Sequence, residues 1–324
     1  MESLSGLGNW RLTVRRQSDG IVILRAVTCD EDAVLPDEMF GLPVIEIADR
    51  ALSAGQAEPE GEEVSVTCGI PKGEWSNRNI RCLTLPAALR TVSDYAFLNC
   101  SSMEKITLHD SVEAFAVSAL MNCRSFREIR LLRDSPGQGP TLAAIIPWLS
   151  RELDVTIEET GAEKLRLIFP EFIEQYIENE PTHFFYYNIE SAGFPYHHVF
   201  HDRQLSLADY DSLWSRYLSA EHDEGAATRL AWWRLRYPRD LSEKAENEYR
   251  NYLCGNLGPA FDMAVKTRDI SGLKMLLKKE NIPSENLEAA RAKAAETGFT
   301  EAVALLLEAQ HQRFSSGRRR KYEL

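Results

Sequence analysis

The feature that most constrains this sequence is a segment of 23 residues that occurs twice in succession. Residues 80–102 and 103–125 align without a gap, and Ile129 and Leu131 continue the series at the same step. The corresponding positions are Leu83 and Ile106, Leu85 and Leu108, Ala96 and Ala119, and Cys100 and Cys123. One unit of this size cannot bury its apolar face alone, so neighbouring copies must stack, and about three are needed for stability. The repeat therefore predicts a solenoid.

Each copy contains the side chains for one short strand and one return. In Leu83-Thr84-Leu85, apolar and polar residues alternate, which is typical of a strand with its two leucines inside and its threonine outside. Residues 95–97, Tyr-Ala-Phe, indicate a helical bend in which alanine permits close approach. Asn99 can bond its own backbone in the turn that follows, and Cys100 acts as a small buried apolar residue.

The pattern Leu-x-Leu-Pro, then Val-x-x-Tyr-Ala-Phe-x-Asn-Cys, resembles the BspA-type leucine-rich repeat common in bacteria. Residues 34–52 are similar to the first repeat of that family: the matching residues are Gly41, Pro43, Val44, Ile47 and Ala51, while Leu52 replaces the usual phenylalanine. The resemblance covers residues 10–131. It implies a leucine-rich-repeat solenoid that binds another protein.

Two further features are expected at the N-terminal end. Residues 10–14 and 21–25 flank Ser18-Asp19-Gly20, a pattern that predicts a β-hairpin capping the open end of the solenoid. Residues 53–79 form an insertion with an acidic run at 58–63. We expect a surface loop here, because long insertions in solenoids project as loops, often beside a binding face.

From Thr141 onward the pattern favours helices. Residues 162–179 are predicted to be helical and divided at Pro170. Residues 260–277 and 290–307 resemble the helix pairs of ankyrin repeats at a step of 30, although the Thr-Pro-Leu-His motif is missing and a generic stack of helical hairpins is the alternative.

The expected fold class is thus α+β: a short solenoid with a β-hairpin cap, then an all-α region ending in ankyrin-like hairpins. The expected divisions are a repeat domain, a helical central region, the helix pairs and a basic tail, at residues 1–135, 136–255, 256–312 and 313–324.

Charge and composition restrict the partners and the compartment. The net charge is −12, which disfavours binding to nucleic acid and to anionic lipid. The chain has no recognisable secretory signal and no apolar run long enough to cross a membrane. Its six cysteines form no CxxC pair, as expected for reduced thiols. These observations predict a cytoplasmic protein without a membrane or nucleic-acid partner.

One group of residues has side chains that could bind a metal ion. His197, His198 and His201 form a His-His-x-x-His cluster, and neutral imidazoles bind zinc. No HExxH motif, nucleophile elbow, phosphate-binding loop or kinase motif is present. We therefore expect no enzyme, no cofactor and no metal, and keep a metal-binding or enzymatic central region as the alternative.

The sequence favours a scaffold that binds another protein of unknown identity. Strand alternation places Cys82 and a set of polar residues outside the solenoid, and we predict these as the contact face. The set is Thr84, Lys105, Thr107, His109, Glu128 and Arg130. A surface adhesin is a further alternative, because proteins with similar repeats are often extracellular.

Overall fold

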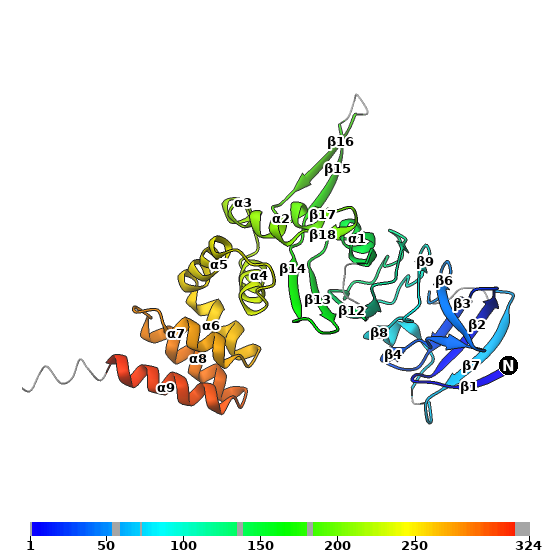
Figure 1. Ribbon diagram of the computed structural model, residues 1–324, viewed down its shortest axis with the longest axis horizontal. Helices are drawn as coiled ribbons and strands as arrows, with labels where there is room; N and C mark the ends of the chain where they lie inside the picture. Colours follow the sequence, from blue (N-terminus) through cyan, green and yellow to red (C-terminus); the bar gives the residue numbers. More distant parts are fainter. Residues whose placement is uncertain (1, 54–58, 72, 135–138, 180–183, 315–324) are drawn as a thin grey trace, which may run out of the picture. The chain divides into compact units, whose positions relative to one another are not determined.

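The computed structural model describes residues 2–53, 59–71, 73–134, 139–179 and 184–314, without the side chains of 2–5, 174–190 and 314 (Figure 1). Contacts divide the chain into two compact units, Met1–Glu221 and His222–Leu324. The first contains a β-solenoid of about five turns, residues 21–159, and the second is helical. The expected α+β fold class is confirmed. The domain divisions expected at 135, 255 and 312 stay predictions.

The solenoid has two sheets. The sheet that we call the front sheet has the strand order β14-β13-β12-β10-β8-β4 and is parallel except for the pair β13–β14. Its strands are β4 (Asp32–Val34), β8 (Cys82–Thr84), β10 (Lys105–His109), β12 (Glu128–Arg133), β13 (Leu153–Glu159) and β14 (Leu165–Phe169).

The second sheet, the back sheet, has the order β1-β7-β2-β3-β6-β9-β11, with β5 paired to β6. Its strands are β1 (Glu2–Ser5), β2 (Trp10–Arg16), β3 (Ile21–Thr28), β5 (Glu38–Met39), β6 (Leu42–Ile47), β7 (Glu62–Thr67), β9 (Thr91–Val92) and β11 (Ala114–Phe115). The β2–β3 hairpin predicted for the N-terminal end is confirmed, since its strands pair antiparallel from Trp10↔Thr28 to Arg16↔Ile21.

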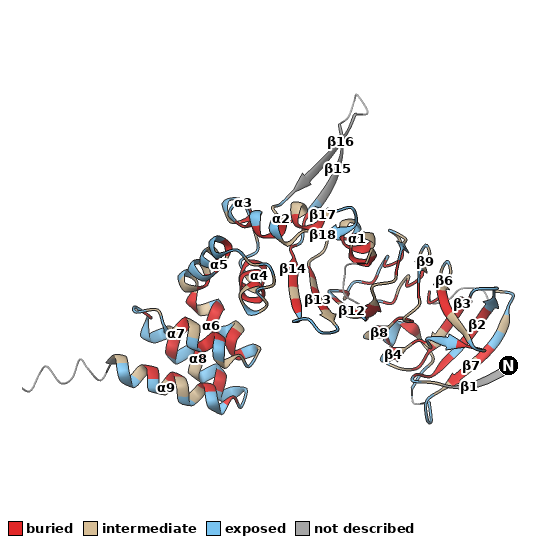
Figure 2. Ribbon diagram, in the orientation of Figure 1, coloured by how far each residue is buried: buried red, intermediate tan, exposed pale blue. Residues whose placement is uncertain are grey.

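The 23-residue step corresponds to one turn of the solenoid. Leu83, Ile106 and Ile129 are direct neighbours on adjacent parallel strands, and each is buried. The buried cysteines follow the same step: the Cys100 thiol contacts the Leu52 carbonyl oxygen, and the Cys123 thiol contacts that of Phe97. Burial raises the pKa of Cys123 to about 12, so both the pattern and the chemistry are those of apolar core residues. Figure 2 shows the buried residues along these strands.

The surface loop expected over residues 53–79 is wrong for much of that segment. Residues 62–67 form β7, which pairs antiparallel with β2 and parallel with β1. Val64 and Val66 alternate with polar residues and are buried, so this short segment has strand periodicity and extends the back sheet. The 3₁₀ helix η1 (Asn77–Asn79) closes the insertion. Residues 54–58 lie outside the described part.

The helices expected from residue 141 are also wrong for part of their range. A short helix, α1 (Thr141–Ile145), and η2 (Ile146–Trp148) are followed by β13 and β14, where 162–179 was predicted to be helical. The register explains the change: Ile129 pairs with Val155, 26 residues later, so β13 adds a further turn whose return contains α1 and η2. Contact with the edge of β12 outweighs the local helical pattern.

Beyond the front sheet the first unit continues with two hairpins, one 3₁₀ helix and two short α-helices. These elements are β15 (Ile173–Asn179) and β16 (Phe184–Glu190), η3 (Phe194–His198), β17 (Phe200–His201), β18 (Gln204–Leu205), α2 (Leu207–Ser212) and α3 (Trp214–Ser219). Tyr210 on α2 closes the edge of β14, because its hydroxyl donates to the Ile168 carbonyl oxygen at 2.6 Å and accepts from the Ile168 N–H at 3.2 Å.

The second unit is a stack of helices. They are α4 (Glu224–Arg236), α5 (Glu243–Gly255), α6 (Leu257–Lys266), α7 (Ile270–Leu277), α8 (Ser284–Glu296) and α9 (Thr300–Phe314). The pairs α6–α7 and α8–α9 share one turn geometry at the predicted step of 30: the Asp269 and Phe299 N–H groups donate to the Ala264 and Ala294 carbonyl oxygens, each at 2.8 Å. The tail expected at 313–324 lies outside the described residues from 315 on.

Candidate binding face of the solenoid

The six residues predicted to form the contact face lie on three adjacent strands of the front sheet. Thr84 is on β8, Lys105, Thr107 and His109 are on β10, and Glu128 and Arg130 are on β12. Their registers align them in rows across the sheet: Lys105 lies between Cys82 and Glu128, and Thr107 lies between Thr84 and Arg130. We call this outward surface of the front sheet the front face.

Exposure differs along the rows. Glu128 is exposed, while Thr84, Lys105, His109 and Arg130 are half-buried. Thr107, at the centre of β10, is only 9% exposed. Charged side chains therefore surround the nearly buried Thr107 on the front face. The long side chains among them cover much of the backbone.

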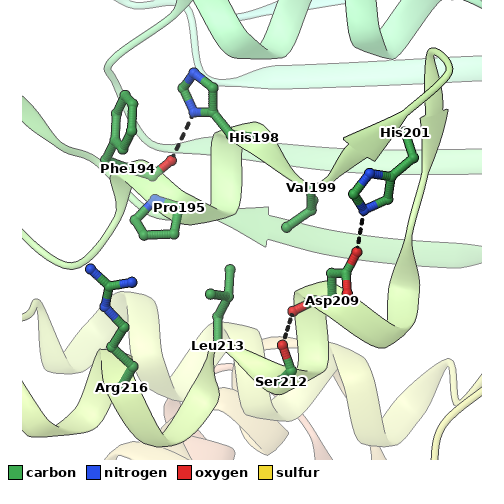
Figure 3. Close-up of a pocket in the computed structure, with 9 residues that line it drawn as sticks. All are labelled: Phe194, Pro195, His198, Val199, His201, Asp209, Ser212, Leu213 and Arg216. Carbon is green, nitrogen blue, oxygen red and sulfur yellow. Dashed lines mark hydrogen bonds and ion pairs between the residues drawn. The ribbon is translucent and has the colours of Figure 1, made fainter.

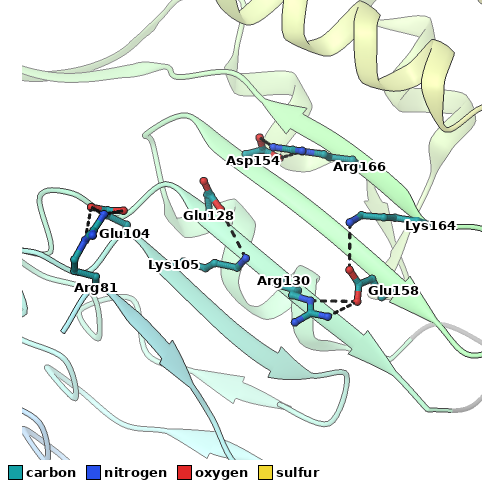
Figure 4. A network of polar contacts seen from close by, with 9 residues as sticks. All are labelled: Arg81, Glu104, Lys105, Glu128, Arg130, Asp154, Glu158, Lys164 and Arg166. Carbon is teal, nitrogen blue, oxygen red and sulfur yellow. Dashed lines mark hydrogen bonds and ion pairs between the residues drawn. The ribbon is translucent and has the colours of Figure 1, made fainter. Parts of the chain in front are cut away.

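Ion pairs connect neighbouring strands across the front face (Figure 4). One pair joins Arg130 Nη2 to Glu158 Oε2 at 2.5 Å, and Lys164 Nζ lies 3.2 Å from the other oxygen of that carboxylate. The further pairs in the figure are Arg81–Glu104 at 3.0 Å, Lys105–Glu128 at 3.9 Å and Arg166–Asp154 at 2.6 Å.

The hydrogen bond from Arg130 holds the pKa of Glu158 below its usual range, and Lys164 adds to this effect. The pairs are partly exposed, so each contributes at most about 1 kcal/mol to the free energy of unfolding. The side chains are therefore largely available for contacts with another molecule, since breaking an internal pair costs little.

Four charged residues of the front face were missed by the sequence reasoning. They are Asp154 and Glu158 on β13, Lys164 before β14 and Arg166 on β14. The segment was expected to be helical, so no outward strand positions were assigned there. The signal that could have found them is the alternation of Leu153, Val155 and Ile157, all buried, with polar residues.

The three histidines considered as metal ligands do not converge. His197 is fully buried, and its ring nitrogens face main-chain oxygens, Nδ1 at 3.1 Å from Ile146 and Nε2 at 2.8 Å from Pro170. His198 is exposed, with Nδ1 at 3.1 Å from the Phe194 carbonyl oxygen. His201 pairs with the Asp209 carboxylate. Within the described residues, no group of three or more His, Cys, Asp or Glu side chains is arranged to hold a metal ion.

Comparison with known protein families gives a match for one segment of the chain. Residues 69–135 match the BspA type leucine rich repeat region. The match contains 6 copies and spans β8, β10 and β12, so the resemblance seen in the sequence is confirmed for this segment. Leucine-rich repeats are a class typically used in protein binding and are generally not catalytic.

Comparisons with curated proteins and with solved structures do not identify a function. No curated protein matches this chain. A crystal structure of a leucine-rich-repeat protein from T. pallidum matches with 22% identity and a TM-score of 0.29, covering 38% of this chain and 51% of that one. The chain thus matches about half the length of that protein. No family match supports the ankyrin resemblance of the C-terminal helix pairs. Among the described residues, no helix is both long and apolar enough to span a membrane.

Proposed function

We propose that this chain is a non-catalytic scaffold that binds another protein through its front face. The observation that carries the proposal is the alignment of the polar rows on β8, β10 and β12, within the segment that matches the leucine-rich repeats. Parallel strands in register hold these side chains at fixed spacings, and a rigid array of this kind loses little conformational freedom on binding.

The charges of the front face indicate the kind of partner surface that fits it. The ion-paired side chains drawn in Figure 4 carry both signs of charge in nearly equal number, so this network is nearly neutral although the whole chain has a net charge of −12. A strongly basic partner would have no particular preference for such a face. A protein surface with both signs of charge can replace the ion pairs within the front face by ion pairs between the two proteins. Such complementary charges contribute more to specificity than to affinity.

The test is capture of partners from the native host with variants that block the face. Thr107→Arg and Thr84→Arg place long side chains in the row that Thr84, Thr107 and Arg130 form, where they obstruct a docked surface. The matched control is Thr91→Arg, which alters a half-buried threonine on β9 of the back sheet. We expect the front-face variants to lose at least about 10-fold in enrichment of one reproducible partner, while the control retains it.

The proposal fails if the partner remains enriched equally by all variants that keep the native circular dichroism spectrum. It also fails if Thr91→Arg abolishes capture while the front-face variants do not, because the back sheet would then be the contact surface. Cross-linking from a photoreactive residue at position 128, which is exposed, supplies a second readout that needs no loss of binding.

We also infer that the helical unit is a second interaction module related to ankyrin repeats. The support is the shared turn of α6–α7 and α8–α9 at a step of 30, together with packing of α6 on α8 and of α7 on α9. Separate capture with residues 222–314 tests this inference. A partner retained by that fragment and lost after changes on the exposed turns supports it.

We further propose that the protein works in the cytoplasm. The support is its set of buried thiols, such as Cys100 and Cys123, which occupy core positions of the repeats. Fractionation of the native host distinguishes this location from the cell surface, where an adhesin would be found.

A further inference from the structure

A surface pocket of about 550 Å³ lies beyond the front sheet in the first unit (Figure 3). It is formed by η3, β17 and the helices α2 and α3, and none of the front-face residues contributes to it. Its lining is mainly apolar, and its volume is in the range of small-molecule sites. The lining residues are Phe194, Pro195, His198, Val199, His201, Asp209, Ser212, Leu213 and Arg216.

The apolar part of this pocket is rigidly supported. Val199 is 3% exposed, and the Phe194 ring packs edge-on against Phe172 with 5.2 Å between the ring centroids. Pro195 fixes the backbone of η3, and Leu213 joins α2 to α3 on the opposite side. An apolar group that enters the pocket therefore meets a preformed surface.

Most polar groups of the pocket already have partners. The Asp209 carboxylate pairs with His201, and this hydrogen bond holds the pKa of Asp209 below its usual range. The Ser212 hydroxyl donates to the Asp209 carbonyl oxygen at 2.7 Å. The Nδ1 atom of His198 lies 3.1 Å from the Phe194 carbonyl oxygen. The Asp209 carboxylate thus already has a hydrogen-bond partner within the pocket.

Arg216 differs from these groups. Its side chain extends from α3 beside Leu213 toward Pro195 (Figure 3). It is exposed, and in the part of the chain that the structure describes, no acid forms an ion pair with its guanidinium. A permanent positive charge with five N–H donors therefore stands at the rim of an apolar pocket.

We propose that this pocket binds a small carboxylate with an apolar body. The carboxylate pairs with the Arg216 guanidinium, whose planar fork matches it in geometry and charge. The apolar body, of the size of a phenyl group with a short chain, lies against Val199, Pro195 and Leu213. This site is independent of the proposed front-face function, because it uses other elements and another kind of ligand.

The test uses two probes of nearly the same shape, 3-phenylpropionate and its neutral amide, titrated into the isotope-labelled full chain and followed by NMR. We expect the carboxylate to bind with a Kd of roughly 1 mM, as befits so small a ligand, and the amide to bind about 10-fold more weakly. The shifted amide signals should belong to residues 194–216.

Three variants assign the interaction. Arg216→Gln should weaken the carboxylate about 10-fold and leave the amide unchanged, so that the two probes become equal. Leu213→Ala should weaken both probes together, since each uses the apolar surface. Arg124→Gln removes an exposed charge from a turn that does not line the pocket, and should leave both affinities as they are.

Equal binding of the two probes by the unmodified chain would overturn the proposal, and so would unchanged carboxylate binding by Arg216→Gln. Absence of saturable shifts in residues 194–216 at high probe concentration counts against it equally. Each variant is compared by its thermal midpoint first, and retention of amide binding by Arg216→Gln shows that its pocket is intact.

Discussion

At the residue scale, one buried side chain joins three segments of the N-terminal end of the solenoid. The Asn77 amide accepts from the Thr28 N–H at 3.0 Å and donates to the carbonyl oxygens of Ala26 and Leu52 at 2.7 and 2.8 Å. Asn77→Ala would remove the side-chain partner of the buried Thr28 N–H and Ala26 carbonyl, and would leave the Leu52 carbonyl with only the weak contact from the Cys100 thiol. We expect the free energy of unfolding to fall by about 3 kcal/mol, as measured by urea denaturation.

The matched control is Asn79→Ala in the same 3₁₀ helix. Asn79 is exposed, so its change should alter stability by less than about 0.5 kcal/mol. If the two variants lose equal stability, the insertion that carries Asn77 is not held by this contact. The expected difference would show that η1 is part of the folded unit rather than of a dispensable loop.

The buried His197 side chain should make the free energy of unfolding depend on pH. Burial lowers the pKa of His197, while the carbonyl groups of Ile146 and Pro170 oppose that effect and the nearby His198 adds to it. Because the folded chain binds this proton less readily than the unfolded chain, the contribution to stability is complete above about pH 6.5. It is lost as the pH falls through that value toward the folded pKa, at no more than about 1.4 kcal/mol per pH unit.

Unfolding curves measured between pH 7.5 and pH 5 test this. His197→Gln should reduce the pH dependence, because glutamine does not titrate. His198→Gln, a change at the exposed neighbour, should retain most of it. A His197→Gln chain with the full pH dependence of the unmodified protein would assign the effect to other groups.

At the scale of the elements, β12 offers two arginines that face opposite sides of one strand. The Arg133 side chain is 5% exposed and its Nε lies 2.5 Å from Asp110, whose carboxylate also accepts from the Gly139 and Thr141 N–H groups at 2.8 and 3.2 Å. The Arg130 side chain is 41% exposed on the front face. Arg133→Ala should lower the free energy of unfolding by about 3 kcal/mol, because it leaves a buried carboxylate without its cation.

Arg130→Ala should cost less than about 1 kcal/mol, as an exposed pair does. Urea denaturation of both variants measures the difference. The comparison matters for the proposed function, since a loss of partner binding in Arg130→Ala can be interpreted only if the fold is retained. Equal losses of stability would mean that the front-face pairs hold the sheet together and are not available for a partner.

Sequence periodicity predicts the strands that recur at a constant step but not the strand at which the step changes. The strands β8, β10 and β12 could be predicted because Leu83, Ile106 and Ile129 recur at a constant step, and the six face residues follow from the same alternation. At β13 the step changes from 23 to 26 residues, so the periodicity no longer identifies the strand. The position of β13 is decided by the unpaired edge of β12, a tertiary contact that local pattern does not contain.

The partners of the face residues were missed for the same reason. Arg130 was assigned to the outer surface, but Glu158, its ion-pair partner, lies on the unrecognised strand. The pocket beside Arg216 could not be foreseen from the sequence, because its lining comes from four short elements whose arrangement depends on packing around buried residues such as Tyr196 and Tyr210. Alternation and repeat length specify sheets, whereas irregular segments are specified by their contacts.

At the scale of the whole molecule, the division into two compact units has a measurable consequence. Asp269 lies entirely within the second unit, where its carboxylate accepts from the Gly272 N–H at 2.9 Å as the cap of α7 and pairs with Arg236 of α4 at 2.5 Å. Its side chain is 9% exposed. Asp269→Ala removes both contacts, and we expect the helical unit to lose about 2 kcal/mol of stability.

Hydrogen exchange on the full chain can locate that loss. If the two units unfold separately, amides of α4–α9 should exchange roughly 30-fold faster in Asp269→Ala, while those of β8, β10 and β12 keep their rates. Asp262→Ala breaks an exposed pair with Lys293 in the same unit and should accelerate exchange only slightly. Faster exchange in the solenoid strands as well would show that both units unfold as one, and a partner bound at the front face would then stabilise the helices too.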